Sequence, residues 1–409
     1  MISLACTTSN AIIGSAMLML TPVCGTVGAQ SAATHDSAGV RIVHNAVSTP
    51  APAIWRIVDP TPLAILGGKA AKGKTALDGV DGAVRLSDGS IVLSDRGHSR
   101  LTFYDPHGAF RFAVDVVGPG EQRAFAEALM PVGPNEMAQW DGVSNRLTIL
   151  NAKGRAVRLR HIENPPWRAE RGGHWRPFID MIGMFAGGDL LGTVHGLYST
   201  PERQTASDSV IAYHVLATGK LDTLGKFLRG ERFGFAKHFE VGGQLPLGRN
   251  GSFAVGSDAW YYTDGASYAI QERTPSGHLT ADVRLDRARQ PVTAAVIAHL
   301  SRARLQRSDP ELRMDDSLAL LWMAFPKSIP AYTALQVDAE HRVWARAWSF
   351  DDEPARWDVF DPAGHFLGAI DVPPDLDVLQ IGADYLLARY TFDPSVDEVR
   401  LYRVHPAGP

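Results

Sequence analysis

The stretch from Gly68 to Thr75 reads GKAAKGKT and formally matches G-x-x-x-x-G-K-[ST], the pattern of a phosphate-binding loop. Such a loop needs a helix directly after it, because the backbone amides of the first helical turn hold the phosphates. Residues 76–82 follow instead, and two glycines within four residues, Gly79 and Gly82, disfavour a helix there. We therefore interpret the stretch as a basic loop and not as a nucleotide site.

Other reactive residue types do not form a catalytic pattern either. The 14 histidines are scattered, without the H-x-x-x-H spacing that places two metal ligands on one helix face. No G-x-S-x-G nucleophile elbow is present. The acidic run Asp351, Asp352 and Glu353 is expected to solvate a loop. The sequence alone thus predicts no catalytic residue.

The N-terminal residues differ from the rest of the chain. Residues 1–29 contain no Asp, Glu, Lys or Arg, and residues 11–25 form an apolar run that Pro22 interrupts. The run is too short for a transmembrane helix, and Val27-Gly28-Ala29 resembles a signal-peptidase site. We predict a signal peptide over 1–29, export to the periplasm or the cell exterior, and a disordered linker over 30–39. A disordered or misassigned N-terminus is the alternative, because no positive segment precedes the apolar run.

Removal of residues 1–29 would also remove both cysteines, Cys6 and Cys24. Disulfides, thiolate metal sites and a thiol nucleophile would then be excluded. A lipid anchor on Cys24 is disfavoured, because Pro22 and Val23 are not the small residues that usually precede a lipidated cysteine. The net charge of −4 argues against nucleic acid as a partner and against a polybasic membrane patch. We expect a monomer.

The elements that would position any site are short strands that recur. Residues 82–116 read as four strands joined by hairpins: AVRL, a Ser-Asp-Gly turn, SIVLSD, RLTFYD, an Asp-Pro-x-Gly turn and AFRFAVDV. The first turn returns in five further places, near 142–145, 187–189, 256–258, 338–341 and 382–384. Six such units predict an all-β, six-bladed β-propeller with four-stranded antiparallel blades over 40–409. A pair of β-sandwiches is the less favoured alternative.

The last unit contains only three strands before the chain ends. An open sheet edge would invite aggregation, so we predict that an N-terminal strand, either Val40–Val47 or Ile54–Val58, closes the ring. Residues 291–325 break the β pattern, and we predict a helical insertion between the fourth and fifth blades. Ser308-Asp309-Pro310-Glu311 is expected to cap its second helix, with Pro310 as the first helical residue. Packed decoration is favoured over a lid or a docking element.

In a propeller the loops between the second and third strands gather around one mouth of the central channel. Arg, His and aromatic residues in these loops would suit a small anionic or sugar-like ligand, and ordinary loop residues are the alternative. The ligand-binding candidates are Asp95, Arg96, His98, His195, Tyr262, Arg346, Trp348 and Arg389. The same loops are expected to carry Asn151, Lys153, Tyr198, Asp264 and Tyr390.

The chain resembles exported, largely uncharacterised bacterial six-bladed propellers of the NHL and TolB-like kind. The resemblance lies in RLSDGSIVLSDRGHSRLTFYDPHGAF, in the following VVGPGEQRAF, and in the stretch from Tyr332 to Val404. Gln122 interrupts the usual G-P-G-E-F element of those proteins. The resemblance implies the fold. Gluconolactonase-like and amidating-lyase propellers, which are related, hold a metal with Glu, Asn, Asp or His, and no such ligand set can be aligned here. A channel calcium or zinc ion therefore remains an open expectation.

Two functions remain. We expect an extracytoplasmic module that binds a protein or a small ligand, and we keep as the alternative a metal-dependent hydrolase or lyase with its site in the channel. An enzyme should bring two or more carboxylate or His side chains with shifted pKa values to one point. The sequence favours the binding module, because no catalytic constellation stands out.

Overall fold

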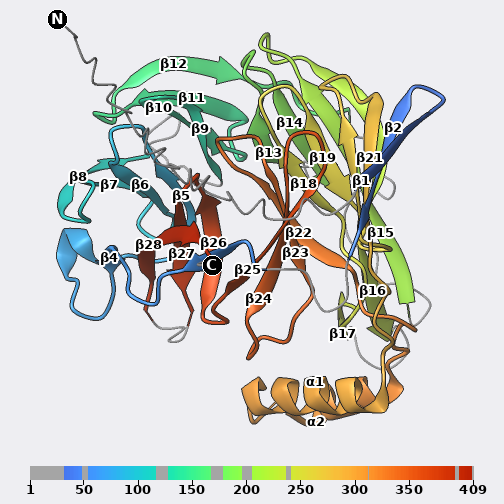
Figure 1. The fold of residues 1–409 in the computed structure, drawn as a ribbon. Coiled ribbons are helices and arrows are strands. Elements are labelled where there is room, and N and C mark those ends of the chain that lie inside the picture. Colours follow the sequence, from blue (N-terminus) through green and yellow to red (C-terminus); the bar gives the residue numbers. More distant parts are fainter. Residues whose placement is uncertain are drawn as a thin grey trace, which may run out of the picture.

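The computed structural model describes residues 32–47, 54–116, 128–166, 178–195, 205–235, 241–311, 313–391 and 396–407. Strand pairing within these residues gives sheets of four to six strands, in which nearly all neighbouring strands are antiparallel. Figure 1 shows the sheets side by side in chain order, with the last one beside the first. This architecture is consistent with a β-propeller. No helix in the described ranges is long and apolar enough to cross a bilayer.

We number the sheets in chain order. The first contains β5 (Val80–Arg85), β6 (Ile91–Asp95), β7 (Arg100–Tyr104) and β8 (Phe110–Asp115). The second contains β9 (Ala128–Gly133), β10 (Glu136–Asp141), β11 (Arg146–Asn151) and β12 (Ala156–His161). The third contains β13 (Ile179–Met184), β14 (Leu190–His195), β15 (Thr205–Val215), β16 (Leu221–Phe235) and β17 (Val241–Gln244).

The fourth sheet contains β18 (Ser252–Val255), β19 (Trp260–Thr263), β20 (Ala269–Arg273) and β21 (Leu279–Asp286), followed at its edge by β2 (Val40–Ala46) and β1 (Ala32–Ser37). The fifth contains β22 (Tyr332–Val337), β23 (Val343–Ala347), β24 (Ala355–Phe360) and β25 (Phe366–Val372). The sixth contains β26 (Leu376–Ile381), β27 (Tyr385–Tyr390) and β28 (Glu398–Pro406), with β3 (Arg56–Val58) and β4 (Ala64–Gly67) both paired to β28.

Turn chemistry explains why each sheet is an up-and-down meander. Gly89 and Gly108 have φ of +84° and +86°, backbone angles that L-residues with a side chain rarely adopt. The Asp105 carboxylate accepts from the amides of His107 and Ala109, both at 2.9 Å, and so holds the Asp-Pro-x-Gly turn. Asp361 and Gly364 repeat this arrangement in the fifth sheet. These turns are local, and the hairpins follow from them.

The apolar core lies between neighbouring sheets. Val84 of the first sheet packs in one cluster with Met137 of the second, and Leu387 of the sixth packs with Ile91 of the first. The Trp140 indole crosses from the second sheet to the third, where it donates a 2.9 Å hydrogen bond to a main-chain carbonyl. The first strands also touch in order, β5 with β9, β9 with β13, β13 with β18, β18 with β22, β22 with β26 and β26 with β5.

The N-terminal segments differ in part from the prediction. Residues 32–37, expected as part of a disordered linker, form β1, which pairs with β2 through a turn at Ala38 and Gly39. The Asp36 carboxylate accepts from the Gly39 amide in that turn, which explains the hairpin. Residues 40–46 pair in parallel with β21 of the fourth sheet and not with the sixth. The β28 strand pairs with β3 and β4.

The helical insertion lies between β21 and β22 and contains α1 (Ala294–Arg307) and α2 (Arg313–Trp322). The expected cap of the second helix was wrong. Ser308 ends α1, where its hydroxyl donates to the Arg304 carbonyl, and Pro310 lies in the turn before α2. The apolar run over 318–325 also divides: Leu321 is 78% exposed on α2, whereas Met323 is buried beside β16 and β17.

Candidate functional site

Asp81 lies at the start of β5, at a point where the strand bulges. Val80 pairs with Asp95 and Gly82 pairs with Ser94, so Asp81 is the extra residue that has no partner on β6. A β-bulge turns one side chain away from the regular alternation of the sheet and is common beside binding sites. Asp81 is exposed to solvent, while Val80 beside it is fully buried.

The surroundings of Asp81 are unusual for an exposed carboxylate. Burial among protein atoms raises its pKa. Four groups oppose this rise: the Ser94 hydroxyl, which donates to the carboxylate, the charge of Arg96, the main-chain amide of Asp81 itself and the charge of Arg389. Asp81, Ser94, Arg96, Asp377 and Arg389 are called the Asp81 cluster below.

Arg389 joins two sheets within this cluster. Its guanidinium donates to the main-chain carbonyl of Val80 at 2.9 Å and to the Asp377 carboxylate at 2.7 Å. Val80 belongs to the first sheet, whereas Asp377 and Arg389 belong to the sixth. The guanidinium is therefore held in place by two contacts before any ligand arrives, which reduces the entropy lost on binding.

Arg96 and Arg346 are the cations that these contacts leave available. Arg96 is exposed in the β6–β7 loop, and Arg346 is half-buried near the end of β23. No hydrogen bond or ion pair joins either guanidinium to a residue within the described ranges. Arg346 pairs with Ala334, directly after a bulge at Thr333, so it occupies the register position in the fifth sheet that Ser94 occupies in the first.

Asp95 has a structural role. Its carboxylate is fully buried and accepts from Arg100 Nε at 2.7 Å, from the Asp78 amide at 3.0 Å and from His98 Nδ1 at 2.9 Å. These bonds fix the β6–β7 loop against the segment that leads into β5. A ligand cannot reach the Asp95 carboxylate while these three bonds persist. His98 can contact a ligand only through the exposed edge of its ring. Because both residues fix the β6–β7 loop, their role is to position Arg96, which lies between them.

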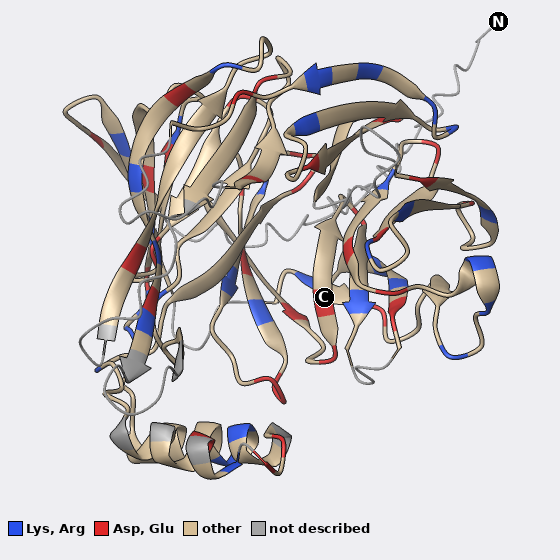
Figure 2. Cartoon of the chain, turned by 180° about the vertical axis from the view of Figure 1, so that it is seen from behind, with Lys and Arg blue, Asp and Glu red and all other residues tan. Residues whose placement is uncertain are grey.

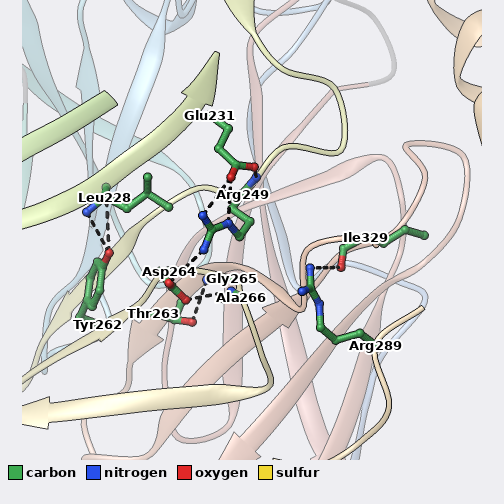
Figure 3. A network of polar contacts seen from close by, with 10 residues as sticks. All are labelled: Leu228, Glu231, Arg249, Tyr262, Thr263, Asp264, Gly265, Ala266, Arg289 and Ile329. Carbon is green, nitrogen blue, oxygen red and sulfur yellow. Dashed lines mark hydrogen bonds and ion pairs between the residues drawn. The ribbon is translucent and has the colours of Figure 1, made fainter. Parts of the chain in front are cut away.

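Tyr262 is likewise committed to the protein interior. Its hydroxyl accepts from the Leu228 amide at 3.1 Å (Figure 3). Its ring packs against Phe227 and Phe253. Burial raises the pKa of Tyr262 to about 12. Figure 3 also shows Arg249, which donates to the Glu231 carboxylate at 3.0 Å and to Asp264 at 3.3 Å. This network ties β16 to the β19–β20 loop.

The other predicted residues are dispersed. Trp348 lines a separate cavity beside α1. His195 ends β14, and its side chain and Tyr198 lie outside the described atoms. Asn151 and Lys153 lie at the β11–β12 turn, between the third and fourth strands of the second sheet. They were expected one loop earlier, because residues 142–145 were interpreted as the turn between the first and second strands, whereas they join β10 to β11. The Gly68–Thr75 stretch contains one 3₁₀ turn, Gly73–Thr75, and continues into β5.

The described residues do not contain a group of three or more His, Cys, Asp or Glu side chains that could hold a metal ion. The structure thus unites two predicted residues, Arg96 and Arg389, with Asp81, which sequence reasoning missed. Asp81 follows an apolar position and precedes Gly82, and the glycine was the available sign of a bulge. Asp377 was missed because its neighbour Arg389 is distant in the sequence.

No protein-family model matches the sequence, and comparison with curated proteins gives no match. Among solved structures, the chain is similar to a luciferin-regenerating enzyme, with 12% identity, a TM-score of 0.42 and coverage of 85% of this chain and 96% of that one. It is also similar to regucalcin, a calcium-binding protein from Agrobacterium tumefaciens, with 14% identity, a TM-score of 0.36 and coverage of 88% of this chain and 96% of that one. A third similarity is to virginiamycin B lyase from Staphylococcus aureus, with 11% identity, a TM-score of 0.37 and coverage of 80% of this chain and 94% of that one. At these TM-scores nothing follows about the activity of this chain.

Proposed function

We propose that the chain is an exported, six-bladed propeller that binds a sugar-like ligand with one anionic group at the Asp81 cluster. The observation that supports this best is the accessible carboxylate of Asp81, which protein surrounds and which Arg96 and Arg389 face. Arg389 is already paired with Asp377. The charges left for a ligand are the carboxylate of Asp81 and the guanidinium of Arg96.

These groups fit a polyhydroxylated acid. A carboxylate accepts hydrogen bonds from sugar hydroxyls, and a guanidinium binds a ligand carboxylate through two parallel N–H donors. A ligand of only anionic character would meet the charge of Asp81, and a neutral sugar would gain no ionic contact with Arg96. Acidic and basic residues are otherwise interspersed over the described ribbon (Figure 2), so a localised site suits the charge pattern better than an extended charged partner.

The test is calorimetric titration of the protein with D-glucuronate, D-glucose and acetate. D-glucuronate should bind at least tenfold more tightly than either of the others. Arg96→Ala and Asp81→Asn should each weaken binding of D-glucuronate about tenfold, and Arg111→Ala, an exposed arginine on β8, should change it less than twofold. Equal binding of glucuronate and acetate, or an equal effect of Arg96→Ala and Arg111→Ala, would contradict the proposal.

Export is the second part of the proposal, and it rests on residues 1–29, which lie outside the described ranges. The full chain, expressed in a bacterial host and recovered from the periplasm, should begin at Gln30. Recovery of a cytoplasmic protein that retains its first residues would contradict this.

The ring is the third part. Support comes from the cyclic order in which the first strands touch, and from β4, which pairs along Glu398–Leu401 at the outer edge of the sixth sheet. We propose that β4 completes the sixth blade and thereby closes the ring.

One observation favours catalysis as a second candidate. A carboxyl group with a raised pKa keeps its proton to a higher pH than an ordinary aspartate and can act as a general acid or base, and Asp81 is such a group in reach of solvent. In this case the bound sugar acid would be converted, and Asp81→Asn would abolish turnover while leaving binding within tenfold. Product analysis by NMR after overnight incubation with D-glucuronate distinguishes the two candidates.

A further inference from the structure

A cavity of about 460 Å³ lies between α1 and the loop that joins β23 to β24. Its volume is in the range of small-molecule sites. The helical insertion supplies one wall and residues 348–352 supply the other. In Figure 2 the insertion lies beneath the strands, at the edge of the molecule. The cavity does not include any residue of the Asp81 cluster.

Aromatic rings form one side of the cavity. The rings of Trp348 and Phe350 meet edge to face, with 4.7 Å between their centroids. The imidazole of His299, from α1, lies against Phe350 at 4.0 Å and connects the two walls. Trp348 and Phe350 are half-buried, so each offers part of its surface to the cavity. Electron-rich ring faces of this kind attract organic cations.

The charged groups around the cavity are predominantly acidic. Arg304 is its one lining arginine, and both Nε and Nη2 donate to Asp316, at 3.0 and 2.7 Å. This pair neutralises itself. Asp352 is then the lining carboxylate that faces His299. Asp352 accepts from His299 Nε2 at 3.1 Å, and its side chain remains 65% exposed, so it can accept further bonds.

The cavity wall also contains a buried polar atom. The Oγ atom of Ser349 is shielded from solvent and has no hydrogen-bond partner within the described chain. A buried hydroxyl without a partner costs free energy, and because this atom is shielded from the open space of the cavity, it stiffens the wall and does not contact a ligand. Ser349 lies between the aromatic side chains of Trp348 and Phe350 in the sequence and lines the same space.

We propose that this cavity binds an organic cation, an ammonium or guanidinium group whose charge faces Asp352 and whose alkyl carbons contact Trp348. Aromatic surface and carboxylates together satisfy such a group better than either does alone, because the rings replace lost water contacts and the carboxylate balances the charge. The cation could belong to a small metabolite or to a basic side chain of a peptide. Both sources present the same chemistry to the cavity.

The experiment compares choline with 3,3-dimethylbutan-1-ol, which has the same shape without the charge, and adds N-acetyl-lysine methylamide as a side-chain probe. Saturation-transfer NMR and calorimetry at low salt should show binding of choline or of the lysine probe, and at least tenfold weaker binding of the neutral alcohol. Binding of choline assigns the site to small cations, and binding of the lysine probe alone assigns it to a peptide. Absence of both, or equal binding of the alcohol, overturns the proposal.

Variants locate the binding. Trp348→Leu and Asp352→Asn should each weaken binding of the cation at least fivefold, and Asp371→Asn, an exposed carboxylate on β25 of the same sheet, should leave it within twofold. Trp348→Leu and Asp352→Asn should also leave the affinity for D-glucuronate unchanged, because the cavity is separate from the Asp81 cluster. Asp352→Asn keeps the experiment decisive if Trp348→Leu fails to fold. An effect of Asp371→Asn equal to that of Asp352→Asn overturns the assignment.

Discussion

The guanidinium of Arg287 donates two hydrogen bonds to the fully buried carboxylate of Asp358, at 2.8 and 2.9 Å. Arg287 directly follows β21, at the entrance to the helical insertion, and Asp358 lies in β24. The Tyr332 hydroxyl donates to the same carboxylate at 3.2 Å. Burial alone would lower the pKa of Arg287, but the Asp358 charge raises it above its ordinary value. This pair therefore anchors the insertion to the fifth sheet.

Removal of either ionic partner should be costly. Arg287→Ala removes both hydrogen bonds of the guanidinium to Asp358 and leaves Arg356, with its Nε 3.6 Å away, as the cation nearest the buried charge. We expect the free energy of unfolding to fall by about 3 kcal/mol. Tyr332→Phe removes one hydrogen bond and should cost about 1 kcal/mol. Urea unfolding followed by circular dichroism measures both. Arg284→Ala, at an exposed pair three residues earlier, should cost less than about 0.5 kcal/mol, and an equal cost for Arg284→Ala and Arg287→Ala would refute the anchoring role.

Asp81 is expected to lower the stability of the protein at neutral pH. Its folded-state pKa is raised, so its contribution is favourable below the unfolded pKa of about 3.9 and is lost as the pH rises through the folded value. Asp81→Asn removes the buried charge and should raise the urea midpoint at pH 7, with a difference that shrinks toward pH 3. A lower midpoint for Asp81→Asn at pH 7 would contradict this. Stability lost at neutral pH would be typical of a residue retained for binding.

Alkaline pH should unfold the protein partly through Tyr262. Burial raises its folded-state pKa to about 12, against about 10 in the unfolded chain, so its stabilising contribution is complete below pH 10 and is lost as the pH rises through 12. Tyr262→Phe should lose less stability between pH 10 and 12 than the parent protein. It should also be slightly less stable at pH 8, because its bond to Leu228 is gone. Urea midpoints of both proteins at four pH values measure this loss, and absorbance at 295 nm follows tyrosine ionisation. An equal loss of stability in the two proteins between pH 10 and 12 would contradict the role of Tyr262.

How much the sequence predicts depends on the distance over which each contact acts. The turns at Gly89, Gly108 and Gly364 are set by neighbours within four residues, and the hairpins around them were predictable. The pairing of β2 with β21 joins segments far apart in the sequence, and no local pattern in Val40–Ala46 distinguishes that partner from β28. Ser308 similarly fits the end of one helix as well as the start of the next.

The candidate site was predicted in part for the same reason. The expected loop positions included Arg96 and Arg389, which lie near Asp81 in the structure. They also included Asp95 and Tyr262, whose burial depends on packing against other segments. Residue type alone does not reveal that the Asp95 carboxylate is already satisfied by Arg100 and His98. Asp81 escaped notice because a bulge is a property of two paired strands, and one strand read alone does not show it.

A disulfide should test the pairing of the N-terminal segment with the last strand. Ile57 of β3 pairs with His405 of β28, and both are partly exposed, so Ile57→Cys with His405→Cys should oxidise readily and raise the melting temperature. Ile57→Cys with Arg403→Cys, two residues out of register, is the matched control and should oxidise poorly. Free-thiol assays on residues 30–409, which contain no native cysteine, distinguish the two proteins.

The β28 strand has a consequence for the order of folding. β3 and β4 precede it by more than 300 residues, and both pair with it. Until Glu398–Pro406 emerges from the ribosome, those early strands lack this hydrogen-bonding partner, and the loop that must close is very long. Such non-local pairing slows folding and leaves intermediates open to aggregation. The newly made protein therefore depends most on protection from chaperones in the interval before Glu398–Pro406 appears.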